Sequence, residues 1–111
     1  MKRRFRLRKS SELKRVRREG KTYAHPLVVL QVLDRPDDHF HIGIVATRSL
    51  GNAVKRNYAK RRLREALRPM LMKISHGWDL VFVARPPILQ ADFETLTLAL
   101  KDLLSKANLL D

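Results

Sequence analysis

The stretch from Gly51 to Pro69, which reads GNAVKRNYAKRRLREALRP, constrains the fold of this chain more than any other. A helix turns by about 100° per residue, so a helix over this stretch separates apolar from polar side chains. One side gathers the apolar residues Ala59, Leu63, Ala66, Leu67 and Met70. The opposite side gathers, at spacing i, i+4, i+7 and i+11, the residues Asn57, Arg61, Arg64 and Arg68. We therefore predict one continuous helix with a buried face and a displayed face.

The displayed face of this helix carries arginines that almost no acid neutralises. Glu65 is the only carboxylate between Asp38 and Asp79. Like charges at i, i+4 repel each other unless an anion lies over them, and solvated faces normally mix both signs. Arginine also presents a planar fork of donors that suits phosphate. We therefore interpret this face as a binding surface for a phosphate backbone rather than as a solvated charged face.

The charge of the whole chain also indicates a polyanionic partner. Its 111 residues are long enough for one domain with a core, and 44 % of them are hydrophobic, which argues against disorder. The formal net charge is +13, and most of the Lys and Arg residues fall in two blocks, residues 1–22 and 48–73. We predict a single RNA-binding domain over residues 1–111, with one charged side and a basic arm over residues 1–9.

The chain as a whole predicts helices and strands in the order α-β-β-β-α-β-α. This order is typical of an α+β domain in which helices pack against one four-stranded sheet. A first helix runs from Ser10 or Ser11 to about Glu19 and ends at Gly20. Strands are expected over Lys21–Ala24, Leu27–Leu33, His39–Thr47 and Trp78–Ala84. A last helix, capped by Asp92, has apolar residues at helical spacing: Phe93, Leu96, Leu100, Leu103, Leu104 and Ala107.

Two further expectations concern the connections. The turn chemistry of Asp34–Asp38 predicts that the strands on either side of it, Leu27–Leu33 and His39–Thr47, pair as a hairpin. Beyond Pro69 we expect the central helix to fray over a continuation that reaches Ile74.

The sequence offers no set of side chains for catalysis or metal binding. It has no cysteine, so a thiolate metal site is excluded. His39 and His41 project from the same side of a strand but lack a third ligand, and the aspartates of the turn, Asp34, Asp37 and Asp38, are expected to serve the turn itself. Phosphodiester hydrolysis by protein alone generally needs clustered carboxylates or a paired acid and base. We expect no catalytic residue, no metal site and no protein-bound cofactor.

No apolar run of the sequence approaches the length of a membrane span, and no apolar signal-peptide core follows the basic residues 2–9. We therefore expect a cytoplasmic protein that has no membrane partner and no obligate protein partner.

Several short runs of the central helix form a distinctive motif: Gly51-Asn52-Ala53-Val54, Arg56-Asn57, Lys60-Arg61 and Arg64-Glu65. This motif resembles the signature helix of the bacterial ribonuclease P protein subunit. The resemblance extends over nearly the whole chain, through Arg6-Leu7-Arg8-Lys9, the helix that closes at Gly20, Gly43 inside a strand, and Ala84-Arg85-Pro86 after the last strand.

The resemblance implies an endoribonuclease whose active site lies on RNA. In that family, a small basic protein binds a large catalytic RNA, and together they remove the 5′ leader of precursor tRNA. The RNA carries the active site and its Mg²⁺ ions, while the protein supports the RNA and contacts the leader through a cleft between the first helix and the sheet. The fold implied is like that of ribosomal protein S5 domain 2, with a left-handed β-α-β crossover, an exception to the usual handedness.

The resemblance also assigns roles to residues of this chain. Five positions match the motif and are candidates for RNA contact: Arg56, Asn57, Lys60, Arg61 and Arg64. The same basic block adds Arg48, Lys55 and Arg68. Tyr58 stands where the family usually has arginine, and we expect it to pack against a loop rather than to stack on a base. Leu13, Arg17 and Gln31 stand at leader-cleft positions where the family often has aromatic residues, which implies that charge holds the leader more than stacking does.

Two alternatives remain at the level of sequence. A structural ribosomal or ribosome-assembly protein would display the same kind of basic surface and bind RNA without cleavage. A module that places its basic helix in the major groove of DNA usually carries a recognition helix after a short turn, or a dimer seam, and neither is recognisable in this sequence.

Overall fold

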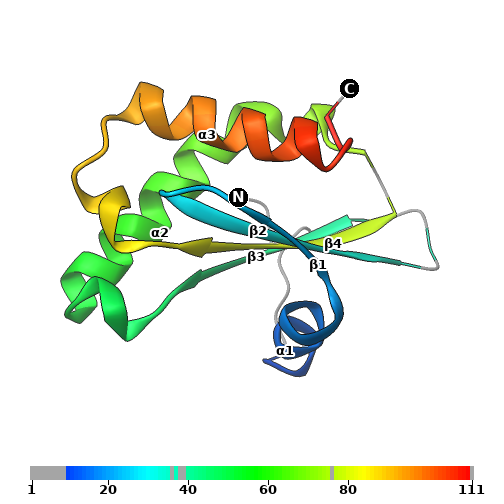
Figure 1. The fold of residues 1–111 in the computed structure, drawn as a ribbon, viewed down its shortest axis with the longest axis horizontal. Coiled ribbons are helices and arrows are strands. Elements are labelled where there is room, and N and C mark those ends of the chain that lie inside the picture. Colours follow the sequence, from blue (N-terminus) through cyan, green and yellow to red (C-terminus); the bar gives the residue numbers. More distant parts are fainter. Residues whose placement is uncertain (1–9, 36, 38–39, 76, 111) are drawn as a thin grey trace.

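The computed structural model describes residues 10–35, 37, 40–75 and 77–110, so the predicted basic arm over residues 1–9 lies outside the described residues. Within them the order of helices and strands agrees with the predicted α-β-β-β-α-β-α order (Figure 1). The elements are α1 (Ser10–Glu19), β1 (Lys21–Ala24), β2 (Val28–Asp34), β3 (Phe40–Ala46), α2 (Ala53–Leu67), β4 (Trp78–Ala84) and α3 (Phe93–Lys106). Three short 3₁₀ segments join them: η2 (Arg48–Leu50), η3 (Arg68–Lys73) and η4 (Pro86–Leu89).

The four strands form one mixed sheet in the order β1-β2-β4-β3. β1 and β4 both pair with β2 in antiparallel fashion, whereas β3 pairs with β4 in parallel. The predicted hairpin between β2 and β3 is therefore wrong, because β4 lies between them. β4 is the strand whose residues are buried on both faces, as Leu80, Val81 and Phe82 show, so it takes a central place where two neighbours shield it.

Because β3 and β4 are parallel neighbours, the chain must cross over between them, and α2 forms that connection. The β3–α2–β4 unit is the crossover that the family resemblance implied. The single α+β domain with this mixed sheet and three helices confirms the fold class predicted from the sequence.

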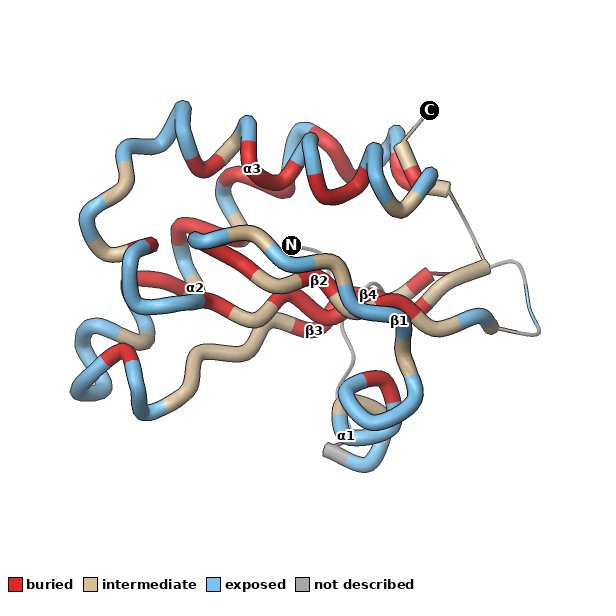
Figure 2. The backbone as a smooth tube through the Cα atoms, in the orientation of Figure 1, coloured by how far each residue is buried: buried red, intermediate tan, exposed pale blue. Residues whose placement is uncertain are grey.

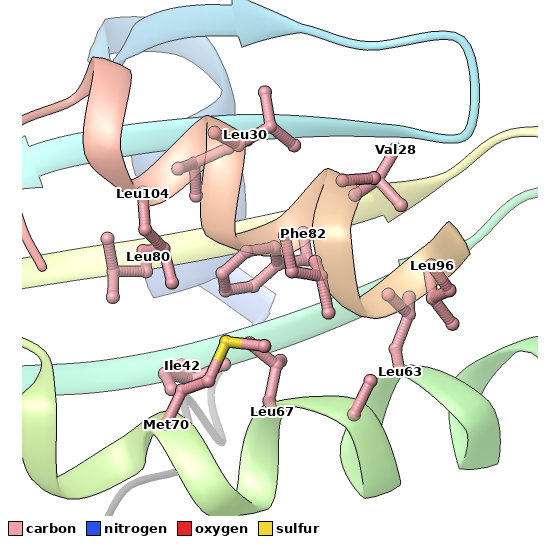
Figure 3. Close-up of a cluster of buried hydrophobic side chains, with 14 of the residues drawn as sticks. Val28, Leu30, Ile42, Leu63, Leu67, Met70, Leu80, Phe82, Leu96 and Leu104 are labelled. Atoms are coloured by element: carbon pink, nitrogen blue, oxygen red, sulfur yellow. The ribbon is translucent and has the colours of Figure 1, made fainter. Parts of the chain in front are cut away.

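One face of the sheet carries the main core, covered by α2 and α3 (Figure 1). Alternate residues of β2 point into it, so Val28, Leu30 and Val32 are buried while the residues between them are not fully buried. Figure 3 shows buried side chains of both helices meeting those of the strands. The labelled members are Val28, Leu30, Ile42, Leu63, Leu67, Met70, Leu80, Phe82, Leu96 and Leu104.

The opposite face of the sheet is covered only in part, by α1 (Figure 1). Val16 of α1 and Val81 of β4 are fully buried, and Leu13 packs against them. The rest of α1 is mostly exposed (Figure 2), as its thin apolar stripe would lead one to expect. The sheet face beside α1 is consequently only partly covered.

Gly20 permits the close approach of α1 to the sheet. A Cβ at this position would lie 2.5 Å from the Val16 carbonyl oxygen and 2.9 Å from that of Val32 on β2. Both neighbours are backbone atoms, so neither can move without displacing a helix end or a strand. The glycine thus ends α1, as predicted, and also allows it to dock.

Replacing Gly20 by alanine is expected to lower the free energy of unfolding by about 1–3 kcal/mol, the usual cost of forcing an extra carbon into a packed site. Urea unfolding followed by circular dichroism measures this. Glu19→Ala, at the exposed neighbouring position, is the control and should change stability by no more than about 0.5 kcal/mol. A Gly20→Ala protein as stable as the control would contradict the close approach.

The other helix ends agree with prediction in part. The Asp92 side chain accepts a hydrogen bond from the Thr95 backbone N–H at 2.7 Å, which lowers the pKa of this capping carboxylate. Phe93, however, is 46 % exposed and does not join the apolar side of α3. The expected fraying after α2 is also wrong, because η3 is a 3₁₀ segment that buries Met70 and Leu71.

Along the described residues, no helix combines the length and apolarity needed to cross a membrane.

Candidate nucleic-acid interface

The start of α2 is built by the first residues of the motif. Gly51 has φ of 121°, a conformation that L side chains rarely adopt, so it turns the chain at the end of η2. Asn52 then caps the helix, since its side-chain oxygen accepts the Lys55 backbone N–H at 3.0 Å. The motif therefore determines where the helix begins and, with it, where the following side chains point.

The structure separates the two faces of α2 as predicted, over one uninterrupted helix. The buried face includes Ala59, Leu63, Ala66 and Leu67. On the displayed face, Asn57, Arg61 and Arg68 are exposed and Arg64 is half-buried. Among the described residues, no carboxylate forms an ion pair with Arg61 or Arg68. The displayed face thus holds cations available to an external anion.

The remaining RNA-contact candidates extend this surface toward the start of the helix. Arg48 on η2 and Lys55 in the first turn are exposed, whereas Arg56 and Lys60 are half-buried. Backbone N–H groups at a helix start add positive potential, which strengthens the attraction for phosphate. The structure brings all eight candidates onto η2, α2 and the residue that follows α2; their contact with RNA stays a prediction. We call this set the α2 surface: Arg48, Lys55, Arg56, Asn57, Lys60, Arg61, Arg64 and Arg68.

Arg62 is a buried residue of α2 that the sequence pattern did not single out. It is only 8 % exposed, and its guanidinium donates hydrogen bonds to the carbonyl oxygens of Ile88 and Ala91. The same guanidinium lies 5.4 Å from the centre of the Tyr58 ring. Arg62 therefore ties α2 to the segment after β4 instead of facing an RNA. The only feature of the sequence that could have indicated this inward role is the position of Arg62 beside the apolar face of the helix.

The three leader-cleft candidates are brought together on the open side of the sheet. Gln31 of β2 donates from its side-chain amide to the Arg17 carbonyl oxygen at 3.2 Å and to Thr22 Oγ1 at 3.4 Å. Leu13 packs on Val16 and Val81, and the Arg17 side chain is exposed. Gln31 consequently helps to hold α1 on the sheet, a role that the sequence did not suggest.

A half-buried apolar strip continues from these residues across the same face. Val29, Val83 and Val45 lie at matching register on β2, β4 and β3, and none of the three is fully buried. The outer side of α1, with Lys14, Arg15, Arg17 and Arg18, is exposed beside them. Cations next to an apolar floor suit a single strand of nucleic acid, which has a charged backbone and apolar base faces.

Arg35 joins the turn residue Asp37 to Asp79 of β4, beside His41 of β3. Arg35 binds Asp37 through Nε at 2.8 Å and binds the nearly buried Asp79 through Nη1 at 2.8 Å. These hydrogen bonds, first from Asp37 and then from Asp79, raise the pKa of Arg35. His41 Nδ1 lies 3.4 Å from the same Asp79 oxygen, and the His41 side chain is half-buried.

Within the described ranges, no group of three or more His, Cys, Asp or Glu residues is arranged to hold a metal ion. His39 and Asp38 lie outside the described residues.

Comparison with solved structures finds the same fold in bacterial ribonuclease P proteins. The ribonuclease P protein of Staphylococcus aureus superposes with a TM-score of 0.84 at 28 % identity, covering 96 % of this chain and 98 % of the other. That of Thermotoga maritima superposes with a TM-score of 0.80 at 30 % identity, covering 91 % of this chain and 96 % of the other.

Sequence comparison agrees. The ribonuclease P protein component of Herpetosiphon aurantiacus is 41 % identical over 98 % of this chain and 89 % of its own length. That of Chloroflexus aurantiacus is 40 % identical over 99 % of this chain and 82 % of its own length. A family model described as Ribonuclease P matches residues 1–108. The α2 motif, the mixed sheet and these matches together show that the chain belongs to the ribonuclease P protein family.

Proposed function

We propose that the protein binds the RNA subunit of ribonuclease P through the α2 surface and that the holoenzyme then removes the 5′ leader of precursor tRNA. The observation that carries this proposal is the row of exposed Asn57, Arg61 and Arg68 on one rigid helix. A helix holds the backbone of these residues at fixed spacing, so little backbone conformational entropy is lost when their side chains meet phosphates. Neutralised phosphates release counterions, which favours association.

We assign the chemistry of cleavage to the RNA subunit and its Mg²⁺ ions. When bound there, Mg²⁺ activates water and neutralises the charge that develops on phosphate. In the protein, Asp37 and Asp79 already face Arg35, and among the described residues no three or more His, Cys, Asp or Glu side chains gather as a metal site would need. The protein's own contribution is to lower the repulsion between phosphates that must approach one another.

We assign the open sheet face beside α1 to the 5′ leader. Val29, Val45 and Val83 supply an apolar floor for base faces, and the exposed Arg17 supplies charge at its edge. Contact with the leader adds affinity for precursor tRNA that the mature product cannot gain. The holoenzyme would then discriminate substrate from product, in the cytoplasm where we expect the protein to act.

Reconstitution tests this function. The protein is mixed with a bacterial ribonuclease P RNA at a Mg²⁺ concentration too low for the RNA to act alone, and precursor tRNA is added. We expect release of the 5′ leader only when protein and RNA are both present, because the basic surface substitutes for part of the screening that Mg²⁺ provides. Binding of ribosomal RNA without any leader cleavage would instead favour the ribosomal alternative.

A further inference from the structure

A groove lies between the first half of α2 and the end of η4, and it shares Asn57 and Arg61 with the displayed face of α2. Its volume is about 600 Å³, within the range of about 300–1,000 Å³ that small-molecule sites occupy. Its lining residues are Val54, Lys55, Asn57, Tyr58, Arg61, Leu89 and Gln90. No carboxylate belongs to this set, and two of its members are cations.

The walls of the groove are apolar although they face solvent. Val54 is 76 % exposed and Tyr58 is 38 % exposed, one helical turn apart on α2. Leu89, which packs against the main core, forms part of the other wall. An aromatic ring and two aliphatic side chains around an open space suit a flat apolar ligand.

Arg62 links α2 to the η4 side of this groove. Its guanidinium lies 5.4 Å from the centre of the Tyr58 ring and is hydrogen-bonded to the carbonyl oxygens of Ile88 and Ala91. The buried cation therefore holds the ring and ties α2 to the segment that carries Leu89 and Gln90. A platform held in this way loses little freedom when a ligand stacks on it.

The rim of the groove provides the groups that a nucleotide needs. Lys55 and the exposed Arg61 can bind a phosphate, and the exposed Gln90 amide offers both a donor and an acceptor to the edge of a base. Arg61 lies 5.8 Å from the Tyr58 ring centre. An exposed cation–π contact is weaker than base stacking on an aromatic ring, so a base can replace Arg61 on the ring and leave it for phosphate.

We propose that this groove captures one unpaired nucleobase of the ribonuclease P RNA, stacked on Tyr58, with its phosphate held by Lys55 and Arg61. The proposal rests on the proposed function, since it requires the protein to bind that RNA. It reverses the expectation that Tyr58 merely packs against a loop. Tyr58 would thus supply stacking where the family usually supplies a positive charge.

The test compares RNA affinities of Tyr58→Leu, Tyr58→Phe and wild type over a range of salt concentrations. We expect Tyr58→Leu to weaken binding of the ribonuclease P RNA by about 10-fold, as loss of one stacked base does. The slope of log affinity against log salt should stay unchanged, because no charge is removed. Tyr58→Phe keeps the ring and should bind within about twofold of wild type. Phe93→Leu, at an exposed aromatic outside the groove, is the control and should bind as wild type does.

Equal affinity of Tyr58→Leu and wild type would overturn the proposal while leaving the proposed function intact. Failure of wild type itself to bind the RNA would overturn both. If a thermal melt shows that Tyr58→Leu is unfolded, ultraviolet cross-linking of the wild-type protein to the RNA tests the stacked base instead. A nucleotide adduct on the tryptic peptide 57–60 supports the stacked base, and its absence from a cross-linked complex overturns it.

Discussion

Replacing both Arg61 and Arg68 by glutamine is expected to weaken binding of the ribonuclease P RNA by about 100-fold or more. Each charge-assisted hydrogen bond contributes about 1.5–3 kcal/mol, and two are lost. The slope of log affinity against log salt should also become shallower by about 1.4–1.8, since two phosphate contacts disappear. Both side chains are exposed, so the free energy of unfolding should change little. Filter binding at several salt concentrations measures both quantities.

The matched control removes two charges from another helix. Lys101 and Lys106 of α3 are exposed, and the double glutamine variant of these residues has the same net charge as the Arg61 and Arg68 variant. Its affinity should stay within a few-fold of wild type if the α2 surface is the specific site. Equal losses in the two variants would mean that net charge alone drives binding, and the assigned interface would be wrong.

Replacing Phe82 by alanine is expected to lower the free energy of unfolding by about 3–5 kcal/mol. Phe82 is fully buried on the central strand β4, under both α2 and α3 (Figure 3). A domain of this size is stabilised by only about 5–15 kcal/mol, so the variant would approach the limit of folding. Urea unfolding monitored by circular dichroism measures the loss, and saturating RNA should restore part of it by binding only the folded state.

Phe93→Ala is the matched control for this change, because the same side chain is removed from a position that is 46 % exposed. Its effect should stay near 0.5 kcal/mol. Comparable losses in Phe82→Ala and Phe93→Ala would show that α2 and α3 do not pack on β4 as described.

Much of the site could be predicted because its features are local in sequence. The cap by Asn52, the two faces of α2 and the end of α1 at Gly20 each depend on residues within a few positions of one another. The exposure of Arg61 and Arg68 followed from the same periodicity. The prediction for Phe93 was wrong: Phe93 is the first residue of α3 and is 46 % exposed although it fits the apolar period of the helix.

Strand pairing could not be predicted in the same way. The turn after β2 indicated a hairpin with β3, yet β4, more than thirty residues further along the chain, lies between them. Turn chemistry describes only the bend of the chain; which strand fills the central position depends on the burial of both strand faces. The strongly apolar β4 gains more from that position than β3 does.

The sequence by itself determined the helix α2, its basic face and its apolar face, since a period of 3.6 residues and a local cap suffice to define them. Only the tertiary structure decided that Arg62 turns inward to the Ile88 carbonyl and that Gln31 holds α1 on the sheet. It also brought Leu89 opposite Tyr58 to form the groove. The hydrogen bonds of Arg62 and Gln31 join segments distant in sequence, and they form because buried or half-buried polar groups need partners wherever the fold presents them.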